Sequence, residues 1–303
     1  MNNVVINQVL ILFVIMIIGF LARRKEVLTP TVSKGLTDLL LNVTCPLTIF
    51  TSFQFTYSRS MLVSAAQVFA FAVAIHLLSV LLGIVLFKRY PEQLKKVLSF
   101  VTIFSNCGFM GFPLLQSIYG KIGVFYGSFY VLVFNLFIWT VGIRIFSGQQ
   151  NRSALKKVIS NPNIIAVGLG LATFLLQIKL PGPVFTAMES VGAMNTPLSM
   201  LLVGAILTEV KPRELFSGFA VYYGTFMRLM FMPFVALIIT DLLNFSPLLQ
   251  GVCVLITATP AASLTTAFTE KYNGDSPFAS RLILLSTLFS MLTLPFFVFL
   301  LNR

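Results

Sequence analysis

Charged residues are scarce in this sequence, and acidic residues are the scarcest. Only 10% of the 303 residues are charged, with nine acidic against 21 basic side chains and a single histidine. Soluble domains have about a quarter charged residues, so this composition excludes a soluble protein, and the 57% apolar content excludes a disordered one. Three cysteines, Cys45, Cys107 and Cys253, lie far apart in apolar runs. Their spacing argues against disulfides or a metal site and favours small buried side chains.

Long apolar runs are what the sequence has instead. The mean hydropathy is +0.93, and a helix needs about 20 apolar residues to cross the hydrocarbon core of a bilayer. Ten stretches are candidates by this measure, although 164–178 is short, and together they leave no room for a soluble domain. We therefore predict an all-α membrane protein with one membrane domain, residues 1–303. The predicted spans are 4–22, 36–53, 61–87, 97–118, 122–146, 164–178, 184–207, 218–239, 248–268 and 282–301.

Lysine and arginine are unevenly distributed between the predicted loops. Sixteen of the 21 fall in the odd-numbered connections, four in the even-numbered ones and the C-terminal tail, and Arg228 lies inside a span. Because basic residues accumulate in cytoplasmic loops, we predict a multi-pass protein of the cell (plasma or inner) membrane with both termini outside. The same asymmetry accounts for the net charge of +12 without a nucleic-acid partner.

A weak repeat divides the chain into two halves. The motif Pro-Leu-Thr at Pro46 returns as Pro-Leu-Ser at Pro197, and the polar residues Asn42 and Asn195 precede the two motifs. Each half has five spans, an odd number, so the second copy must be inverted in the membrane. We expect Asn42 and Asn195 to contribute to coupling or to the transport pathway. The predicted units are a five-helix repeat over 1–146, a short cytoplasmic linker over 147–163 and a second repeat over 164–303.

Helix-breaking and polar residues interrupt the fourth and ninth spans at matching places. Proline removes a backbone donor and glycine loosens a helix, and unpaired backbone groups are tolerated at membrane depth only inside protein or beside a water-filled cavity. Paired broken helices in inverted halves point to a transporter's binding site, and half-helix N-termini attract anions; the alternative is a packing kink. The candidate substrate-binding residues are Asn106, Gly108, Gly111, Pro113, Thr257, Thr259, Pro260, Ser263 and Thr265.

Few ionisable side chains fall within the predicted spans. Arg228 is a further substrate-binding candidate, because guanidinium binds carboxylates in a bidentate manner; clamping of freed backbone carbonyls is an equally open alternative. Asp38 and Glu189 lie near span ends, where we expect them to reach water, and the lone His76 is expected to pack. Glu270 follows the polar run of the ninth span and is a candidate for binding a coupling ion, with a solvated carboxylate as the alternative.

Short motifs of one known family are spread along the whole chain. They are the run 106–113, Asn161-Pro162, Pro197-Leu198 with Gly204, Arg228-Leu229 with Pro233, Pro260-Ala261-Ala262, the run 270–275, and Ser286-Thr287 with Pro295. Their order and spacing resemble the auxin efflux carrier family, ten-span transporters of organic anions. The resemblance implies a fold related to that of the bile acid/sodium symporters, in which helices four and nine cross near the membrane centre. It also implies that spans one, two, six and seven form a scaffold, often dimeric, and that the others form a moving transport unit.

The predicted function is secondary active transport of a small organic anion by alternating access, with an elevator-like movement. Substrates in the family range from indole acetate to malate and malonate, so the resemblance implies a carboxylate without naming it. Plant members carry a long hydrophilic loop where this chain has only 147–163, so we do not expect regulation through that loop.

A cation/proton antiporter on a similar scaffold is the alternative, although that chemistry favours carboxylates in the broken helices. No enzyme is predicted, since the chain lacks an HExxH motif and facing aspartates. We expect no cofactor or metal, and we expect a homodimer in the bilayer. Whether transport is coupled to H+ or Na+ is left open.

Overall fold

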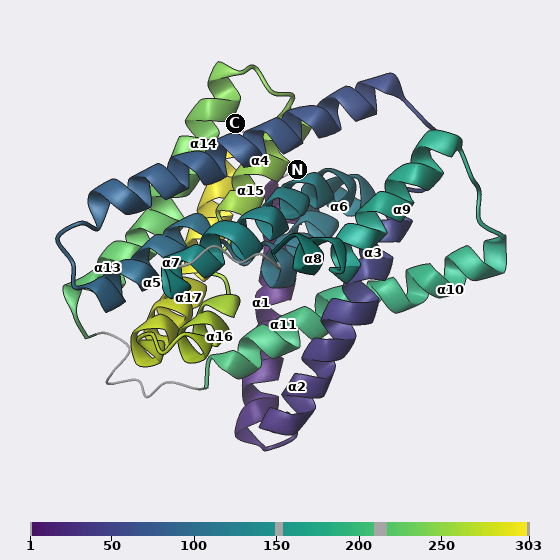
Figure 1. The fold of residues 1–303 in the computed structure, drawn as a ribbon. Helices are drawn as coiled ribbons and strands as arrows, with labels where there is room; N and C mark the ends of the chain where they lie inside the picture. Colours follow the sequence, from purple (N-terminus) through teal and green to yellow (C-terminus); the bar gives the residue numbers. More distant parts are fainter. Residues whose placement is uncertain (1, 149–153, 209–216, 302–303) are drawn as a thin grey trace.

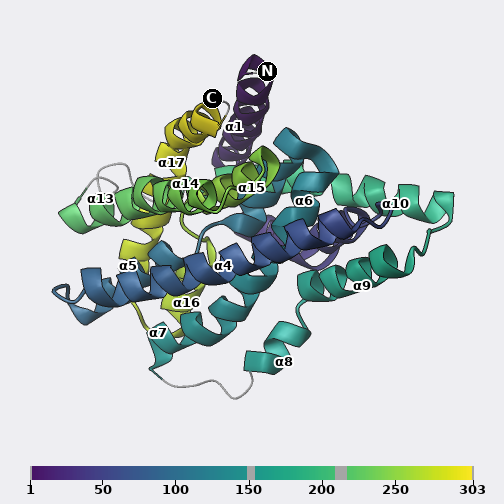
Figure 2. The ribbon, with the colours of Figure 1, turned by 90° about the horizontal axis from the view of Figure 1, so that it is seen from above.

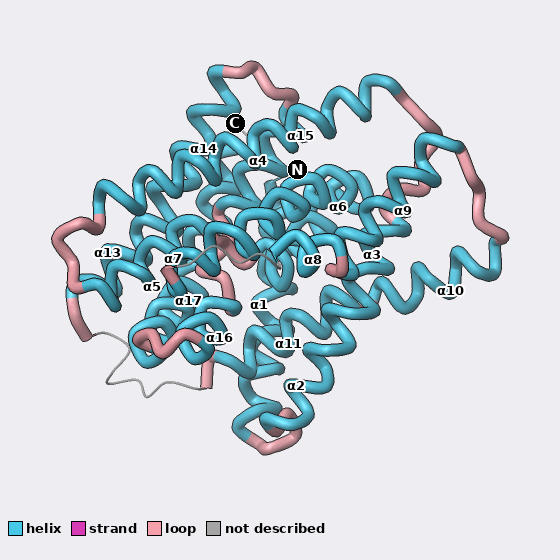
Figure 3. Tube along the Cα trace, in the orientation of Figure 1, coloured by secondary structure: helices cyan, strands magenta, loops and turns pink. Residues whose placement is uncertain are grey.

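The protein is built almost wholly of helices (Figure 3). The computed structural model describes residues 2–148, 154–208 and 217–301, and within these ranges short loops and one isolated β-bridge join the helices. Lipid offers no partners for backbone N–H and C=O groups, and a helix pairs these groups internally. The prediction of an all-α protein is confirmed.

Several helices are long enough to cross a bilayer. Among the described residues, five helical stretches have both the length and the apolar composition for this. Large apolar side chains on their outer faces are exposed, such as Leu81 on one stretch at 60% and Leu292 on another at 72%, and lipid is the solvent that such faces require. The stretches are Asn7–Arg24, Arg59–Leu86, Cys107–Ser147, Phe219–Leu242 and Ser276–Leu301.

The first half of the chain contains three long helices, α1, α4 and α6, and several shorter pieces (Figure 1). In chain order its elements, with η for a π-helix, are α1 (Asn2–Arg24), α2 (Pro30–Leu39), η1 (Leu40–Thr44), α3 (Cys45–Thr51), α4 (Arg59–Leu86), α5 (Glu92–Ile103), η2 (Cys107–Gly111), α6 (Phe112–Phe137), η3 (Ile138–Gly142) and α7 (Ile143–Ser147). α6 bends sharply at Gly120, whose φ of 62° and ψ of −149° are open only to glycine. This bend separates the predicted spans 97–118 and 122–146.

The described part of the second half is divided into as many elements as the first. Its elements are α8 (Ala154–Ile159), α9 (Pro162–Leu176), α10 (Gly182–Ala193), α11 (Asn195–Ile206), α13 (Phe219–Phe226), η4 (Met227–Phe231), α14 (Met232–Leu242), α15 (Pro247–Thr257), α16 (Leu264–Lys271) and α17 (Ser276–Leu301). The predicted seventh span is therefore divided at Met194, and a helix that we did not predict lies within the linker 147–163.

Two helices begin well before the apolar runs that predicted them. α2 starts at Pro30, where the Thr29 hydroxyl accepts a hydrogen bond from the Val32 N–H at 3.3 Å. α17 starts at Ser276, and an Asp275 carboxylate oxygen accepts from the Phe278 N–H at 2.9 Å. These polar caps fix the helix starts, whereas hydropathy detects only the apolar part that follows.

Three π-helical turns each precede a proline. η1, η2 and η4 end two residues before Pro46, Pro113 and Pro233. In each case the N–H of the residue just before the proline bonds the carbonyl five residues back, as Phe112 does to Cys107. Proline cannot donate a backbone hydrogen bond, so the wider turn lets the chain continue as a helix. Such turns are frequent at functional sites.

Helix contacts divide the described structure into two groups. In the scaffold group, α1 packs along α11, and α3 packs against α9 and α10; α2 completes this group. In the crossing group, α6 packs against α4 and α15, and α17 packs against α13 and α16, with α5 and α14 beside them. Figure 2 shows α9 and α10 at one end of the molecule, α5 and α13 at the other, and the two chain ends on the same side. The groups meet where α1, α3, α9 and α11 contact α6 and where α1 contacts α17.

Candidate functional site

The two interrupted helices meet at their breaks. Ser105 and Ala261 form an antiparallel β-bridge, in which the Asn106 N–H donates to the Pro260 carbonyl at 2.7 Å and the Ala262 N–H donates to the Phe104 carbonyl at 3.1 Å. Each break thus pairs backbone groups that the other has freed, which is the condition for irregular backbone in a membrane. The two helices come apart at the same place in the fold.

Asn106 joins the breaks through its side chain as well. This residue is buried, and its Nδ2 donates to the Ser263 hydroxyl oxygen at 3.2 Å. Its carbonyl accepts from the N–H groups of Met110 and Gly111, both at 3.1 Å, and so starts η2. Because the Ser263 oxygen accepts from the amide, the Ser263 proton is free to donate to another group.

Arg228 ties together the ends of the two helices that stop at the breaks. Its side chain is 1% exposed, and its guanidinium donates to the carbonyl of Thr102 at 3.0 Å and to the carbonyl of Thr257. Thr257 is the last residue of α15, and Thr102 lies one residue before the end of α5. These carbonyls carry the partial negative charge of the helix C-termini. The contacts favour the clamp over direct pairing with a substrate.

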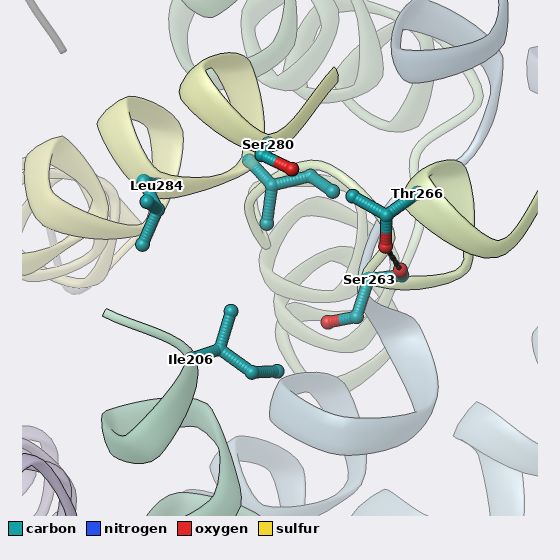
Figure 4. A pocket seen from close by; sticks show the side chains of 6 residues that line it. Ile206, Ser263, Thr266, Ser280 and Leu284 are labelled. Carbon is teal, nitrogen blue, oxygen red and sulfur yellow. Dashed lines mark hydrogen bonds between the residues drawn. The ribbon is translucent and has the colours of Figure 1, made fainter. Parts of the chain in front are cut away.

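A cavity of about 170 Å³ adjoins the crossing at Ser263. In Figure 4 the Ser263 hydroxyl points into the space between Ile206, Ser280 and Leu284. Thr266 stands beside it, with its hydroxyl donating to the Ser263 carbonyl at 3.0 Å. The walls come from α11 of the scaffold group and from α16 and α17 of the crossing group. The cavity therefore lies between the two groups and combines hydroxyls with apolar side chains.

Sequence comparison identifies the family. The family described as Membrane transport protein matches residues 4–158 and 149–298, two stretches that divide near the middle of the chain. The chain belongs to the auxin efflux carrier family. It is 25% identical over 302 residues to an uncharacterized transporter of Methanocaldococcus jannaschii, covering 95% of this chain and 96% of the relative. It is 23% identical over 312 residues to the uncharacterized transporter YfdV of Escherichia coli K12, covering 97% and 96%. The protein is a multi-pass membrane transporter of this family and not an enzyme.

The glycines after the first break have different surroundings in this transporter. A Cβ added to Gly108 would meet nothing within 4 Å, whereas one added to Gly111 would lie 3.1 Å from Cγ1 of Ile256 on α15. Gly111 thus sets the close packing of η2 on α15, and Gly108 borders open space. Pro113 is buried in the first turn of α6.

Three predicted hydroxyl groups lie at the second break but do not line the cavity. Those of Thr259 and Thr265 donate to carbonyls of their own turns, Ile256 at 2.9 Å and Ala262 at 2.6 Å. The Thr257 side chain is buried beside Tyr130. Ser263 is the predicted hydroxyl of this run that reaches the cavity, and Pro260 contributes its carbonyl to the bridge.

The three coupling or pathway candidates lie in different environments. Glu270 is exposed on α16. Asn42 is exposed in η1, where its amide donates to the Asp38 carbonyl at 2.9 Å. Asn195 is 1% exposed at the start of α11, and both its amide nitrogen and its oxygen lack a partner among the described residues. Asn42 and Asn195 belong to elements that contact each other, η1 and α11, whereas Glu270 belongs to α16 of the crossing group.

His76 packs as expected. It is 1% exposed, and its ring lies 5.2 Å from that of Tyr130 and 5.1 Å from that of Phe137, measured between centroids. Its Nδ1 is 2.7 Å from the Ala72 carbonyl, while its Nε2 has no partner within the described part of the chain.

Sequence reasoning missed most of the cavity wall and one contact between the groups. Thr266 and Ser280 could have been found from the sequence, because they are hydroxyl residues in or near the ninth span. The apolar residues of the wall have no feature in the sequence that marks them. Lys121, just after the Gly120 bend, forms a 2.5 Å ion pair with Glu189 of α10. Glu189 therefore pairs with a cation of the other group, where we expected it only to reach water.

Proposed function

We propose that this transporter moves a small organic anion, a carboxylate such as malate, malonate or an auxin-like acid, across the cell membrane by alternating access. The observation that supports this most strongly is the cavity at Ser263, which lies between the scaffold group and the crossing group beside the paired breaks. A site at such a junction changes the side to which it opens when one group moves against the other.

The chemistry of the cavity suits a carboxylate. Ser263 has a proton to donate, and Ser280 brings a further hydroxyl to the wall, while the Thr266 hydroxyl donates to the Ser263 carbonyl. α16 begins at Leu264, directly after Ser263, so the positive end of its dipole faces the same region. Asn106 positions the Ser263 hydroxyl through its amide, and Arg228 holds the two helix ends that frame the crossing. The apolar wall suits the carbon chain of a small acid.

The proposed movement is elevator-like, within ten spans arranged as two inverted repeats whose broken helices cross near the membrane centre. Ile206 ends α11 and Ser280 lies in the second turn of α17, so the cavity adjoins the loops that the positive-inside rule assigns to the cytoplasm. The ion pair of Lys121 and Glu189 joins the two groups on the predicted outer side. This combination supports an inward-open state that is closed toward the outside.

A cation/proton antiporter is the second candidate, and the groups at the breaks argue against it. Neither 104–111 nor 257–266 contains a carboxylate, and Glu270 on α16 is exposed. Coupling of anion transport to H+ or Na+ remains part of the proposal to be tested, as does a homodimer formed through the scaffold group.

Uptake into proteoliposomes tests the anion proposal. Labelled malate and malonate are offered with a proton gradient, a sodium gradient or neither. We expect saturable uptake of a carboxylate, and we expect Ser263→Ala and Ser280→Ala to raise its KM about tenfold, because a hydrogen bond to a charged group is worth roughly 1.5–3 kcal/mol.

Ser290→Ala is the matched control. Ser290 is another buried serine of α17, its hydroxyl bonds the Thr287 carbonyl at 2.6 Å, and it does not line the cavity. This variant should keep the wild-type KM. Proton-driven cation exchange without carboxylate uptake would favour the antiporter instead, and equal KM values for all three variants would remove the cavity from the substrate path.

A further inference from the structure

A second cavity, of about 420 Å³, lies within the crossing group. It is formed by α4, α5, η3 and α7, and it shares no lining residue with the cavity at Ser263. α5 and α7 also pack against each other, as do α4 and α5. Nothing in the proposed transport cycle uses this second cavity.

One side of the second cavity is an apolar groove open toward lipid. Val80 and Ile84 of α4 line it together with Val141 of η3 and Ile145 of α7. Ile84 is 54% exposed and its neighbour Leu81 is 60% exposed, so this part of α4 faces the bilayer. An acyl chain can therefore enter the groove sideways without crossing a polar barrier.

The floor of the groove is closed by a tight contact between α4 and α5. A Cβ added to Gly83 would lie 3.2 Å from Cβ of Ser99, and the Ser99 hydroxyl donates to the Gly83 carbonyl at 3.3 Å. Because this bond pairs the Ser99 hydroxyl, the floor offers no free polar group to water, and an apolar occupant suits it better.

The other side of the cavity carries three cations. Lys95 forms an exposed ion pair with Glu92 at 3.4 Å, and Lys96 donates to the Phe146 carbonyl at 3.3 Å. Arg144 is exposed and has no ion-pair partner among the described residues. With one carboxylate against three cations, this rim favours an anion, and a solvent-exposed ion pair such as that of Lys95 is weak enough to be exchanged for a phosphate.

We propose that this cavity binds an anionic phospholipid of the predicted cytoplasmic leaflet, with its phosphate on Lys95, Lys96 and Arg144 and an acyl chain in the groove. A basic pocket between helices at the cytoplasmic boundary is a recognised form of lipid site. A free phosphate uses only the rim and a neutral lipid only the groove, whereas an anionic lipid matches both. The occupant would move with the crossing group.

Binding of phosphatidylglycerol to the purified full-length protein tests this site. Phosphatidylcholine and inorganic phosphate serve as the other two probes, and native mass spectrometry with lipid titration gives the affinities. We expect wild type to prefer phosphatidylglycerol over phosphatidylcholine by about tenfold, as two or more surface cations allow. Lys95→Gln combined with Arg144→Gln should abolish the preference. Ile84→Trp, which fills the groove at a position that already faces lipid, should lower phosphatidylglycerol binding while leaving the cations in place.

Lys25→Gln combined with Lys34→Gln is the charge-matched control, because both lysines are exposed and predicted to lie on the same side of the membrane. This variant should keep the wild-type preference. An equal loss in the control would mean diffuse attraction, inorganic phosphate competing as well as the lipid would mean a free-anion site, and unchanged binding in Ile84→Trp would mean that no chain enters the groove. Each of these three results overturns the proposal. None bears on carboxylate uptake, which is measured separately.

Discussion

The two breaks form the crossing together, but each contributes different chemical groups to it. The first, residues 104–106, is short, and the chain resumes as the π turn η2, with Gly108 and Gly111 inside it. The second, residues 258–263, is longer and resumes directly as the α-helix α16. The first break donates through the Asn106 N–H, the Asn106 amide and the Ser105 hydroxyl, whereas the second accepts through the Pro260 carbonyl and the Ser263 hydroxyl.

The second break is also held from a third helix. The Ala261 N–H donates to the Ser286 hydroxyl of α17 at 3.1 Å, whereas the Ser105 hydroxyl of the first break donates to the Ile256 carbonyl of α15 at 3.2 Å. The two breaks are therefore held in place in different ways. The first break is held through two side chains, the Ser105 hydroxyl and the Asn106 amide, and the second through backbone groups, one of which bonds α17. Arg228 is what the two breaks share, since it bonds the helix that ends at each.

Removing the shared clamp should have the largest effect. Arg228→Met leaves the carbonyls of Thr102 and Thr257 without their donor, and each bond from a charged donor contributes roughly 1.5–3 kcal/mol. We expect the free energy of unfolding to fall by about 3 kcal/mol or more, seen as a large drop in the melting temperature of the detergent-purified protein.

Arg228→Lys is the graded control for the clamp. Lysine keeps the charge but presents it as a single point rather than a planar fork, so it should hold one carbonyl and give intermediate stability. If Arg228→Met melted like wild type and yet no longer gained stability from malonate, Arg228 would be a substrate contact and the two breaks would have no shared clamp.

The sequence predicted the breaks well because their signals are local. Prolines, glycines and hydroxyl residues in an apolar run reveal where a helix cannot continue, and that reasoning identified both Asn106 and Ser263. It did not reveal the partners of Arg228, because a carbonyl bonded in this way belongs to an ordinary helical residue such as Thr102. Ile206 and Leu284 were missed for a related reason: an apolar side chain at a cavity wall looks the same in sequence as one that faces lipid.

Of the two residues that form the bridge hydrogen bond, Asn106 should matter more for transport through its side chain than Pro260. Asn106→Ala removes the bond that positions the Ser263 hydroxyl, and we expect carboxylate uptake to fall about tenfold, the equivalent of roughly 1.4 kcal/mol. Pro260→Ala keeps the carbonyl that accepts from the Asn106 N–H, so uptake should fall less than threefold. Initial rates in proteoliposomes, normalised to folded protein, measure both.

The same pair of variants bears on the site as a whole. Wild-type uptake in both Asn106→Ala and Pro260→Ala would show that the crossing does not bind the substrate. A greater loss in Pro260→Ala than in Asn106→Ala would reverse the comparison, because it would make the second break the one that depends on its side chain.

The smallest effects should come from the two glycines of the first break, and they should differ in kind. Gly111→Ala places a methyl 3.1 Å from Ile256 Cγ1, and we expect a stability loss of about 1 kcal/mol from overpacking.

Gly108→Ala meets nothing within 4 Å, so stability should hold or rise slightly, because alanine restricts the unfolded chain. If the open space at Gly108 is part of the anion's route to the N–H groups of η2, Gly108→Ala slows uptake in a protein that melts no lower than wild type. Melting curves and uptake rates of the two variants separate these effects, and a stable Gly108→Ala variant with unchanged uptake would assign the ligand to the second break alone.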